Sequence, residues 1–398
     1  MKYRRFGKTE LEMPVVTAGG MRFQASWNAA ELDKITDEGQ ANVEACLRRA
    51  LELGIRHIET ARGYGTSELQ VGRALASLNV PLDEIILQTK IGPTETGEQF
   101  VEQFEDSMAR LRVERVDLLA IHGINNDEKL DRTIRPGGCL EALERLRAEG
   151  RVGHVGFSTH GPTDIIVKTI ATGRFEYVNL HWFWIDQTRW PAIQAATDRD
   201  MGVFIISPTD KGGRLFEPPE RLVRLCEPLS PIAFNDLFCL LHDEVHTLSI
   251  GARRPEDYDE HVRAVEMLDD PEAGRIAGRI DERLHAAFEK VLGKAWCATW
   301  DQHLPAWPDT PNEVNIPFIV RLHDLAKVLD LEAFCKDRYR LLGNADDWVP
   351  GKKLGETDPA DLAECLSGSP HAERILEILA EAHEHFAGEE AKRLQQEE

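Results

Sequence analysis

Long apolar runs are missing from this 398-residue chain, although 42% of its residues are hydrophobic. A membrane-spanning helix needs about 20 consecutive apolar residues, so we expect the chain to have no membrane partner. The opening stretch MKYRRFGKTE also lacks the apolar core of a signal peptide. Both absences favour a cytoplasmic protein.

Basic charge is scarce as well. The sequence has 47 Lys and Arg against 69 Asp and Glu, a formal net charge of −22. Such a chain repels polyanions, so we expect neither nucleic acid nor anionic lipid as a partner. Seven cysteines spread along the sequence favour reduced thiols over a disulfide framework. None of these patterns indicates an oligomeric state.

Short β-like runs alternate with longer helix-like stretches from Tyr3 to about Met267. Eight such units in about 250 residues predict an α/β fold, a (β/α)8 TIM barrel. A doubly wound open sheet is the alternative, but the sequence lacks the G-x-G-x-x-G turn that this fold would carry. A hairpin at Tyr3–Met13 is expected to close the barrel bottom. The predicted strands are Val15–Gly19, Ile55–Glu59, Ile85–Lys90, Val116–Ile121, Val152–Ser158, Tyr177–His181, Val203–Ser207 and Thr247–Gly251.

After Met267 the strand signals stop, and the remaining sequence is typical of helices separated by loops. We therefore predict two domains, a barrel at 1–268 and an all-helical domain at 269–398. The charged last residues, Gly388–Glu398, are expected to fray. The predicted helices are Glu272–Leu292, Ile316–Val328, Leu331–Leu341 and His371–Phe386.

In a barrel of this kind, reactive groups come from the carboxyl ends of the strands. Glu59, Tyr64, Lys90 and His122 all follow or end neighbouring strands, so we expect them at one mouth. Each alone has an ordinary structural alternative, such as a loop tyrosine or a buried core histidine. Four suitable residue types at the ends of three successive strands favour a catalytic group.

These four side chains suit the reduction of a carbonyl. When a hydride reaches the carbonyl carbon, negative charge develops on the oxygen, and a positioned acid must neutralise it. Tyrosine, with an ordinary pKa of about 10, becomes an effective proton donor only when a nearby cation favours its phenolate. Lys90 would be that cation, Glu59 would hold Lys90, and His122 would orient the substrate oxygen.

The sequence contains the motifs RRFGKTELEMPVV, GIRHIETARGYGTSELQVGRAL, the QTK and IHGI strand ends, GFSTHG and SIGARRPEDYDEHVRAVE. Over roughly residues 1–268, these motifs resemble the aldo-keto reductase superfamily. The resemblance implies a (β/α)8 barrel that binds NADPH (NADP) across its mouth. It implies that Tyr64 is the general acid, with Lys90 and His122 as its partners. Glu59 stands where the family usually has Asp, and its side chain reaches ~1.5 Å further.

The resemblance also implies a set of cofactor-binding residues. Ser158 and Asn179 align with the residues that bind the nicotinamide carboxamide, whereas Thr159 and Ile206 replace an amide-binding Asn and a stacking aromatic ring. Arg253 and Arg254 offer forked donors for a 2′-phosphate, although a solvated helix start is their alternative. The remaining expected cofactor contacts are Ser207, Lys211, Gly213 and Gly251, with Lys211 beside the pyrophosphate.

A substrate pocket is expected around Trp182, Trp184 and the loop Asn125–Gly138. Core packing of the HWFW segment is the equal alternative for the tryptophans. In the helical domain, the spacing Cys297-x2-Trp300-x2-His303-x3-Trp307-Pro308 resembles a ferredoxin run with three of four ligands replaced. The predicted domain is therefore ferredoxin-like without a cluster, with no metal.

The sequence thus predicts an NADPH-dependent reductase of a small-molecule carbonyl. Two other classes stay open. The first is a nucleotide-binding barrel with little turnover that acts as a sensor or scaffold, which the Glu59, Thr159 and Ile206 departures would permit. The second is an electron-transfer protein that binds a metal through Cys297, His303 and Cys365.

Overall fold

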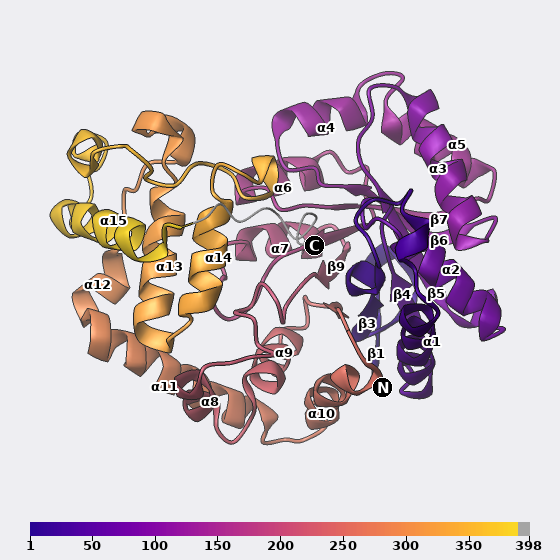
Figure 1. The fold of residues 1–398 in the computed structure, drawn as a ribbon, viewed down its shortest axis with the longest axis horizontal. Helices are drawn as coiled ribbons and strands as arrows, with labels where there is room; N and C mark the ends of the chain where they lie inside the picture. Colours follow the sequence, from indigo (N-terminus) through magenta and orange to yellow (C-terminus); the bar gives the residue numbers. More distant parts are fainter. Residues whose placement is uncertain (389–398) are drawn as a thin grey trace. The chain divides into compact units, whose positions relative to one another are not determined.

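The computed structural model describes residues 1–388, and the chain divides into two compact units (Figure 1). The first comprises Met1–Gly212 and Asn235–Ala273, and the second comprises Gly213–Phe234 and Gly274–Glu398 as far as it is described. The segment Gly213–Phe234, which we expected within the barrel domain, thus groups with the C-terminal helices. We expected residues 388–398 to fray, and all of them except Gly388 lie outside the described residues.

Eight parallel strands form a closed barrel in the first unit, and the predicted fold class is confirmed. Neighbouring strands follow the chain order, and the last strand closes the barrel by pairing with the first, Leu248 opposite Val16. The strands are short and largely buried, as expected for parallel strands that are covered on both faces. The strands are β3 (Val16–Gly19), β4 (His57–Glu59), β5 (Ile86–Ile91), β6 (Val116–His122), β7 (Val152–Ser158), β8 (Tyr177–Leu180), β9 (Gly202–Ile205) and β10 (Thr247–Ile250).

The N-terminal hairpin closes one end of the barrel interior, as the sequence predicted. Strands β1 (Tyr3–Arg5) and β2 (Glu12–Pro14) pair antiparallel. Phe6 and Met13 are fully buried among the inward-facing strand residues, including Tyr177. A Cβ at Gly202 would lie 2.5 Å from the Phe6 ring, so only glycine leaves room for this ring.

Helices cover the outer face of the barrel, and most of them bury an apolar stripe. In α1, Thr36 caps the first turn by accepting a hydrogen bond from the Gly39 amide, and Val43, Leu47 and Ala50 are buried. The helices are α1 (Asp37–Glu52), α2 (Ser67–Ser77), α3 (Gly97–Leu111), α4 (Asp127–Ile134), α5 (Cys139–Ala148), α6 (Thr163–Ala171), α7 (Trp190–Thr197), α9 (Pro231–Leu240) and α10 (Asp259–Met267).

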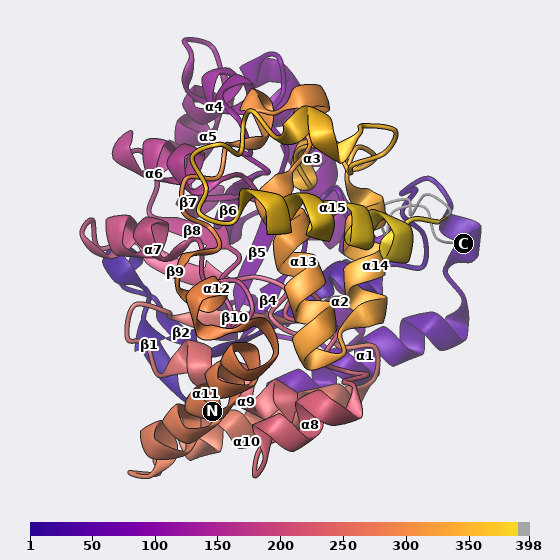
Figure 2. The ribbon, with the colours of Figure 1, turned by 90° about the vertical axis from the view of Figure 1, so that its left-hand side faces the viewer.

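The second unit is helical, and α13 packs against both α14 and α15 (Figure 2). Trp296 is fully buried, and its indole N–H donates to Asp324 Oδ2 over 2.7 Å. Trp300 and Trp307, which stand at two of the ligand positions of the ferredoxin-like spacing, are only half-buried. Its helices are α8 (Glu220–Cys226), α11 (Ala273–Leu292), α12 (Lys294–Thr299), α13 (Ile316–Leu329), α14 (Glu332–Leu341) and α15 (Ala372–Phe386).

Residues 1–388 carry three features that bear on a membrane span, on disulfides and on a metal site. No helix there has both the length and the apolar character that crossing a bilayer requires. All seven cysteines are free thiols. No three His, Cys, Asp or Glu side chains in that range are arranged to hold a metal ion, so the metal-binding alternative gains no support from this part of the chain.

Candidate active site

A buried ion pair and a phenol meet at the carboxyl ends of β4 and β5. The Lys90 side chain is almost completely buried and pairs with Glu59, which ends β4. The Lys90 ammonium also donates to Tyr64 Oη and to the Thr60 carbonyl, each over 3.1 Å. The structure therefore brings together three of the four residues that the strand ends predicted.

His122, the fourth residue, ends β6 and faces the same phenol. Its ring lies edge-on to the Tyr64 ring, with centroids 5.6 Å apart. The Lys90 ammonium lies 4.6 Å from the Tyr64 ring centroid, and Trp27 packs edge-on from another side at 6.5 Å. Tyr64 is thus enclosed by an imidazole, an ammonium and an indole, while its hydroxyl points at Lys90.

The charge on this group depends on burial and on the ion pair. Burial lowers the pKa of Lys90 well below its ordinary value, because the ammonium loses its hydration. The Glu59 carboxylate opposes this effect by stabilising the charged form, and Ser249 Oγ donates to Glu59 Oε2 over 3.1 Å. Removing one partner of such a buried pair leaves the other charge unpaired, at a cost of about 3–5 kcal/mol.

A polar layer lies one strand step below the ion pair. His57 Nδ1 lies 2.7 Å from Thr17 Oγ1, and His57 Nε2 lies 3.0 Å from Gln88 Oε1. Burial lowers the pKa of His57 to about 3, so its imidazole is neutral. This layer was not predicted from the sequence, although His57 and Gln88 each precede a site residue by two positions and therefore share its face.

Two expected cofactor residues are placed to meet an amide. Ser158 and Asn179 end adjacent strands β7 and β8 as register partners, and both are buried. Neither Nδ2 nor Oδ1 of Asn179 has a hydrogen-bond partner. A buried carboxamide with both groups unsatisfied is costly unless a ligand pairs with it, and the carboxamide of a nicotinamide offers the matching acceptor and donor.

Two departures from the expected cofactor site are also visible. The Thr159 hydroxyl donates to the Ile124 carbonyl over 2.7 Å and accepts from the Gly161 amide. Its hydrogen bonds therefore stabilise the backbone of the local turn. Ile206 is 8% exposed and packs with the barrel interior. Its aliphatic side chain offers no ring for stacking.

Lys211 is directed at two histidines that the sequence analysis did not single out. Its ammonium lies 3.0 Å from His160 Nδ1 and 3.1 Å from His181 Nε2. His160 and His181 stand two residues after Ser158 and Asn179, a spacing that would have placed them on the same faces. Ser207 takes a left-handed conformation before this turn. Gly213 belongs to the second compact unit, so its expected contact stays a prediction.

The arginine pair stands at a helix start. The backbone amides of Arg253 and Arg254 both donate to Asp257 Oδ2, and Arg254 Nε donates to Asp257 Oδ1 over 3.0 Å. The Arg254 side chain is 75% exposed. Gly251 lies against Arg22, which pairs with Asp210 at 3.5 Å. Both guanidinium groups can therefore reach solvent, and their role toward a 2′-phosphate stays a prediction.

Trp182 is core rather than pocket wall. It is 2% exposed, stacks on Phe238 with ring centroids 4.9 Å apart and packs with Trp190 at 5.1 Å. The physical reason is strand alternation, because the preceding His181 faces inward and Trp182 therefore faces the helices. Trp184 is 9% exposed, and its backbone amide donates to Asn235 Oδ1. A pocket role stays a prediction for Trp184 only.

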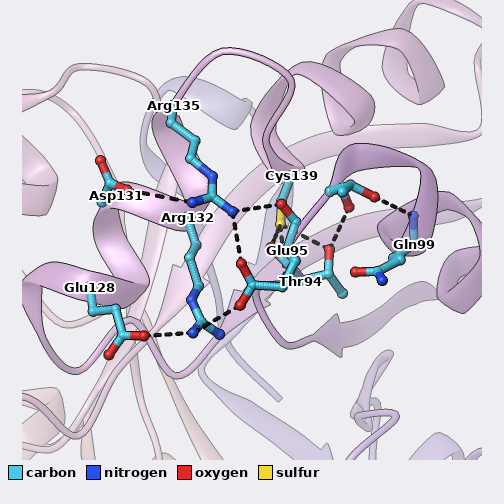
Figure 3. Close-up of polar contacts among 9 residues, drawn as sticks. Thr94, Glu95, Gln99, Glu128, Asp131, Arg132, Arg135 and Cys139 are labelled. Atoms are coloured by element: carbon cyan, nitrogen blue, oxygen red, sulfur yellow. Dashed lines mark hydrogen bonds and ion pairs between the residues drawn. The ribbon is translucent and has the colours of Figure 1, made fainter.

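The loop Asn125–Gly138 contains α4 and is braced by ion pairs (Figure 3). Arg132 and Arg135 both contact Glu95, at 2.9 Å and 3.0 Å, from the segment that follows β5. Cys139 Sγ accepts a hydrogen bond from the Thr94 amide beside them. The loop is therefore tied to the end of the strand that carries Lys90.

Comparisons with known proteins agree with this arrangement. Residues 15–208 match the family described as "Aldo/keto reductase family". The chain is 33% identical over 139 residues to an aldo-keto reductase of Mycobacterium sp. (strain KMS), covering 35% of this chain and 48% of the relative. It is 25% identical over 324 residues to an L-galactose dehydrogenase of Arabidopsis thaliana, covering 73% of this chain and 98% of that protein.

A solved structure shows the same fold. The holo form of an aldo-keto reductase from Bacillus halodurans aligns with a TM-score of 0.58 at 23% identity, covering 71% of this chain and 96% of that one. The match spans about half the length of the mycobacterial relative. Together these comparisons show that residues 15–208 are similar to aldo-keto reductases and that the chain shares their barrel fold.

Proposed function

We propose that the chain is an NADPH-dependent aldo-keto reductase that reduces the carbonyl of an aldehyde or ketone to an alcohol. The similarity of residues 15–208 to the aldo/keto reductase family supports the reaction class. One observation carries the mechanism: the ammonium of the buried Lys90 lies 3.1 Å from the hydroxyl of the partly buried Tyr64. This contact prepares a phenol to give up its proton.

Bound NADPH would supply the hydride to the carbonyl carbon. The Tyr64 hydroxyl would donate its proton to the carbonyl oxygen as negative charge develops there. Lys90 would stabilise the phenolate that remains, and Glu59 would keep the ammonium charged and in place. His122, edge-on to Tyr64, would hydrogen-bond the carbonyl oxygen and fix its approach.

The cofactor would be held by groups on the same strand ends. The unsatisfied Asn179 amide and Ser158 would pair with the nicotinamide carboxamide. The exposed Arg253 and Arg254 would contact the 2′-phosphate. Trp184 would contribute apolar surface for a small carbonyl substrate. Lys211, Ser207, Gly213 and Gly251 complete the proposed cofactor contacts.

The test uses the full chain with NADPH and a panel of aldehydes and ketones. NADPH affinity is measured by fluorescence quenching, and turnover by loss of the reduced cofactor's absorbance. Tyr64→Phe should bind NADPH like the wild type and lose turnover, because only the acidic proton is removed. Tyr3→Phe is the matched control, since its hydroxyl contacts the Gly54 carbonyl on the hairpin side. Turnover retained in Tyr64→Phe would contradict the assignment of the acid.

A second candidate is a nucleotide-binding barrel that turns over little and acts as a sensor or scaffold. The observation that favours it is the pair of departures at Thr159 and Ile206, which remove an amide contact and a stacking ring. NADPH binding without turnover of any carbonyl in the panel would support this candidate instead.

A further inference from the structure

Four charged side chains gather on the outer side of the barrel, behind the strand that carries Lys90. They are Arg62, Glu68, Asp106 and Arg110, from the turn after β4 and from α2 and α3, and we call them the outer charge cluster. Asp106 Oδ2 pairs with Arg62 and lies 2.8 Å from Arg110 Nη2. Glu68 Oε1 accepts from Thr89 Oγ1 over 2.7 Å, and Thr89 directly precedes Lys90. The cluster therefore contacts both segments that carry the proposed proton donor and its cation.

Arg62 is the side chain best placed to fix the turn that carries Tyr64. Its backbone amide donates to the Lys90 carbonyl over 3.0 Å, and the Tyr64 amide donates to the Ala61 carbonyl over 3.0 Å. Only Gly63 separates Arg62 from Tyr64, and it has no side chain with which to anchor the turn. Arg62 points outward to Asp106 while Tyr64 points inward to Lys90. A shift of Arg62 is thus transmitted to Tyr64 through two peptide units.

Both arginines of this cluster pair with Asp106, whereas burial raises the pKa of the Glu68 carboxyl. Burial acts to raise the pKa of Asp106, but its contacts with Arg62 and Arg110 outweigh this and lower it. The Asp106 side chain is 45% exposed, and exposed ion pairs add little to overall stability. Positional precision matters far more, because a displacement of about 1 Å can cost about a hundredfold in rate. The ion pairs of Asp106 are therefore better suited to fixing geometry than to adding overall stability.

We propose that Arg62 and Asp106 are positioning residues for Tyr64. Their ion pair holds the turn after β4 so that the Tyr64 hydroxyl stays within hydrogen-bond distance of the Lys90 ammonium. The effect on catalysis rests on the proposed function, whereas the effect on Tyr64 itself can be measured without substrate or cofactor.

Fluorine NMR of the full chain labelled with 3-fluorotyrosine gives this measurement. The sequence has five tyrosines, so five resonances are expected, and Tyr64→Phe identifies the one from Tyr64. Asp106→Asn keeps the side-chain volume and removes the charge, and Arg62→Ala removes the anchor. Both should shift or broaden the Tyr64 resonance and leave the other four unchanged. Arg62→Lys keeps a cation for Asp106 and should return the resonance toward its wild-type position.

Glu105→Gln is the matched control. Glu105 precedes Asp106 on α3 and pairs with Arg151 at 3.0 Å, away from the Tyr64 turn. This variant removes a carboxylate from the same helix and should leave the Tyr64 resonance in place. Circular dichroism and thermal melting show which variants are folded. If Arg62→Ala does not fold, the test of the proposal rests on Asp106→Asn.

An unchanged Tyr64 resonance in folded Asp106→Asn would overturn the proposal, as would an equal shift in Glu105→Gln. With 4-nitrobenzaldehyde as the carbonyl probe, kcat should fall about tenfold in Asp106→Asn while KM stays near the wild-type value. An equal fall of kcat in Asp106→Asn and in the control Glu105→Gln would contradict the role of Asp106. Inactive wild-type protein would contradict the reductase proposal only, because the resonances still report the position of Tyr64.

Discussion

The Ser249 hydroxyl reaches Glu59 Oε2 from β10, with β3 between the two strands. This contact is possible because Gly19 on β3 has no side chain, since a Cβ there would lie 2.5 Å from Ser249 Oγ. The longer side chain of Glu59 thus passes over a glycine to a neighbour two strands away. Lys90 pairs with Oε1 of the Glu59 carboxylate, and Ser249 donates a hydrogen bond to its Oε2.

Glu59→Asp is therefore expected to keep the Lys90 pair and to lose the Ser249 contact, because the side chain shortens by ~1.5 Å. Turnover of the full chain with NADPH should change by at most about tenfold, ~1.4 kcal/mol. Ser249→Ala is the control, since it removes the same hydrogen bond and keeps Glu59. Complete loss of activity in Glu59→Asp would show that the mouth requires the longer side chain.

Arg253→Ala combined with Arg254→Ala should weaken NADPH binding about tenfold or more and leave NADH binding nearly unchanged. Only NADPH carries the 2′-phosphate, and a charged hydrogen bond contributes about 1.5–3 kcal/mol. Fluorescence titration with both cofactors measures the difference. Asp257→Asn tests whether the arginine pair serves only to begin the helix, because it changes the carboxylate that accepts from both backbone amides there. Equal weakening of both cofactors in the double variant would identify the pair as a structural helix start.

Stability should fall as the pH is lowered from about 6.5 to 4. Burial lowers the pKa of His57 to about 3, whereas the unfolded imidazole takes up a proton near pH 6.5. The unfolded state then binds more protons than the folded state in this window, so the free energy of unfolding decreases, by about 3 kcal/mol for this residue at pH 4. Burial also lowers the pKa of His246 to about 4, which acts in the same direction.

Urea unfolding at several pH values checks this dependence. His57→Gln should flatten the decrease between pH 6.5 and 4, because glutamine does not titrate. His285→Gln should leave the decrease unchanged, since the His285 side chain is 62% exposed. A wild-type unfolding free energy that does not vary over this window would contradict the neutral buried state of His57.

The purified protein should be colourless, and chelators should leave the melting of its C-terminal helices unchanged. An iron–sulfur cluster normally needs four thiolates, and the ferredoxin-like spacing retains only Cys297. The buried Trp296, bonded to Asp324 and covered by the Arg374 guanidinium at 4.0 Å from its ring, supplies packing there instead. Brown colour, or stoichiometric iron after anaerobic purification, would contradict this prediction.

The strands were predictable because each is a short apolar run bounded by turn residues, and all eight predicted runs overlap an observed strand. Some helices gave no such signal. In α4, only Leu130 and Thr133 are buried, too few for a periodic stripe, and α7 begins at Trp190–Pro191, which is typical of a turn. A short helix held by ion pairs or by a proline start cannot be found by hydrophobic periodicity.

The residues that meet at Tyr64 were predictable from their positions at strand ends, since parallel strands bring those ends together. The direction of the Lys211 side chain could not be predicted from the sequence, because it depends on which neighbouring turn supplies a hydrogen-bond partner. For Trp182 the sequence left a pocket wall and core packing equally open, and the alternation along its strand favours core packing. Residue type indicates chemistry, whereas the face on which a residue stands requires the strand register.

The fit of Phe6 against Gly202 links the first residues of the chain to a strand almost two hundred positions later. Because the ring fills the space that a side chain at position 202 would need, the two positions cannot vary independently. Among divergent descendants of this chain, a larger residue at 202 should be accompanied by a smaller one at position 6. The hairpin and the barrel wall would then evolve as one coupled unit, even though the proposed chemistry lies at the opposite end of the strands.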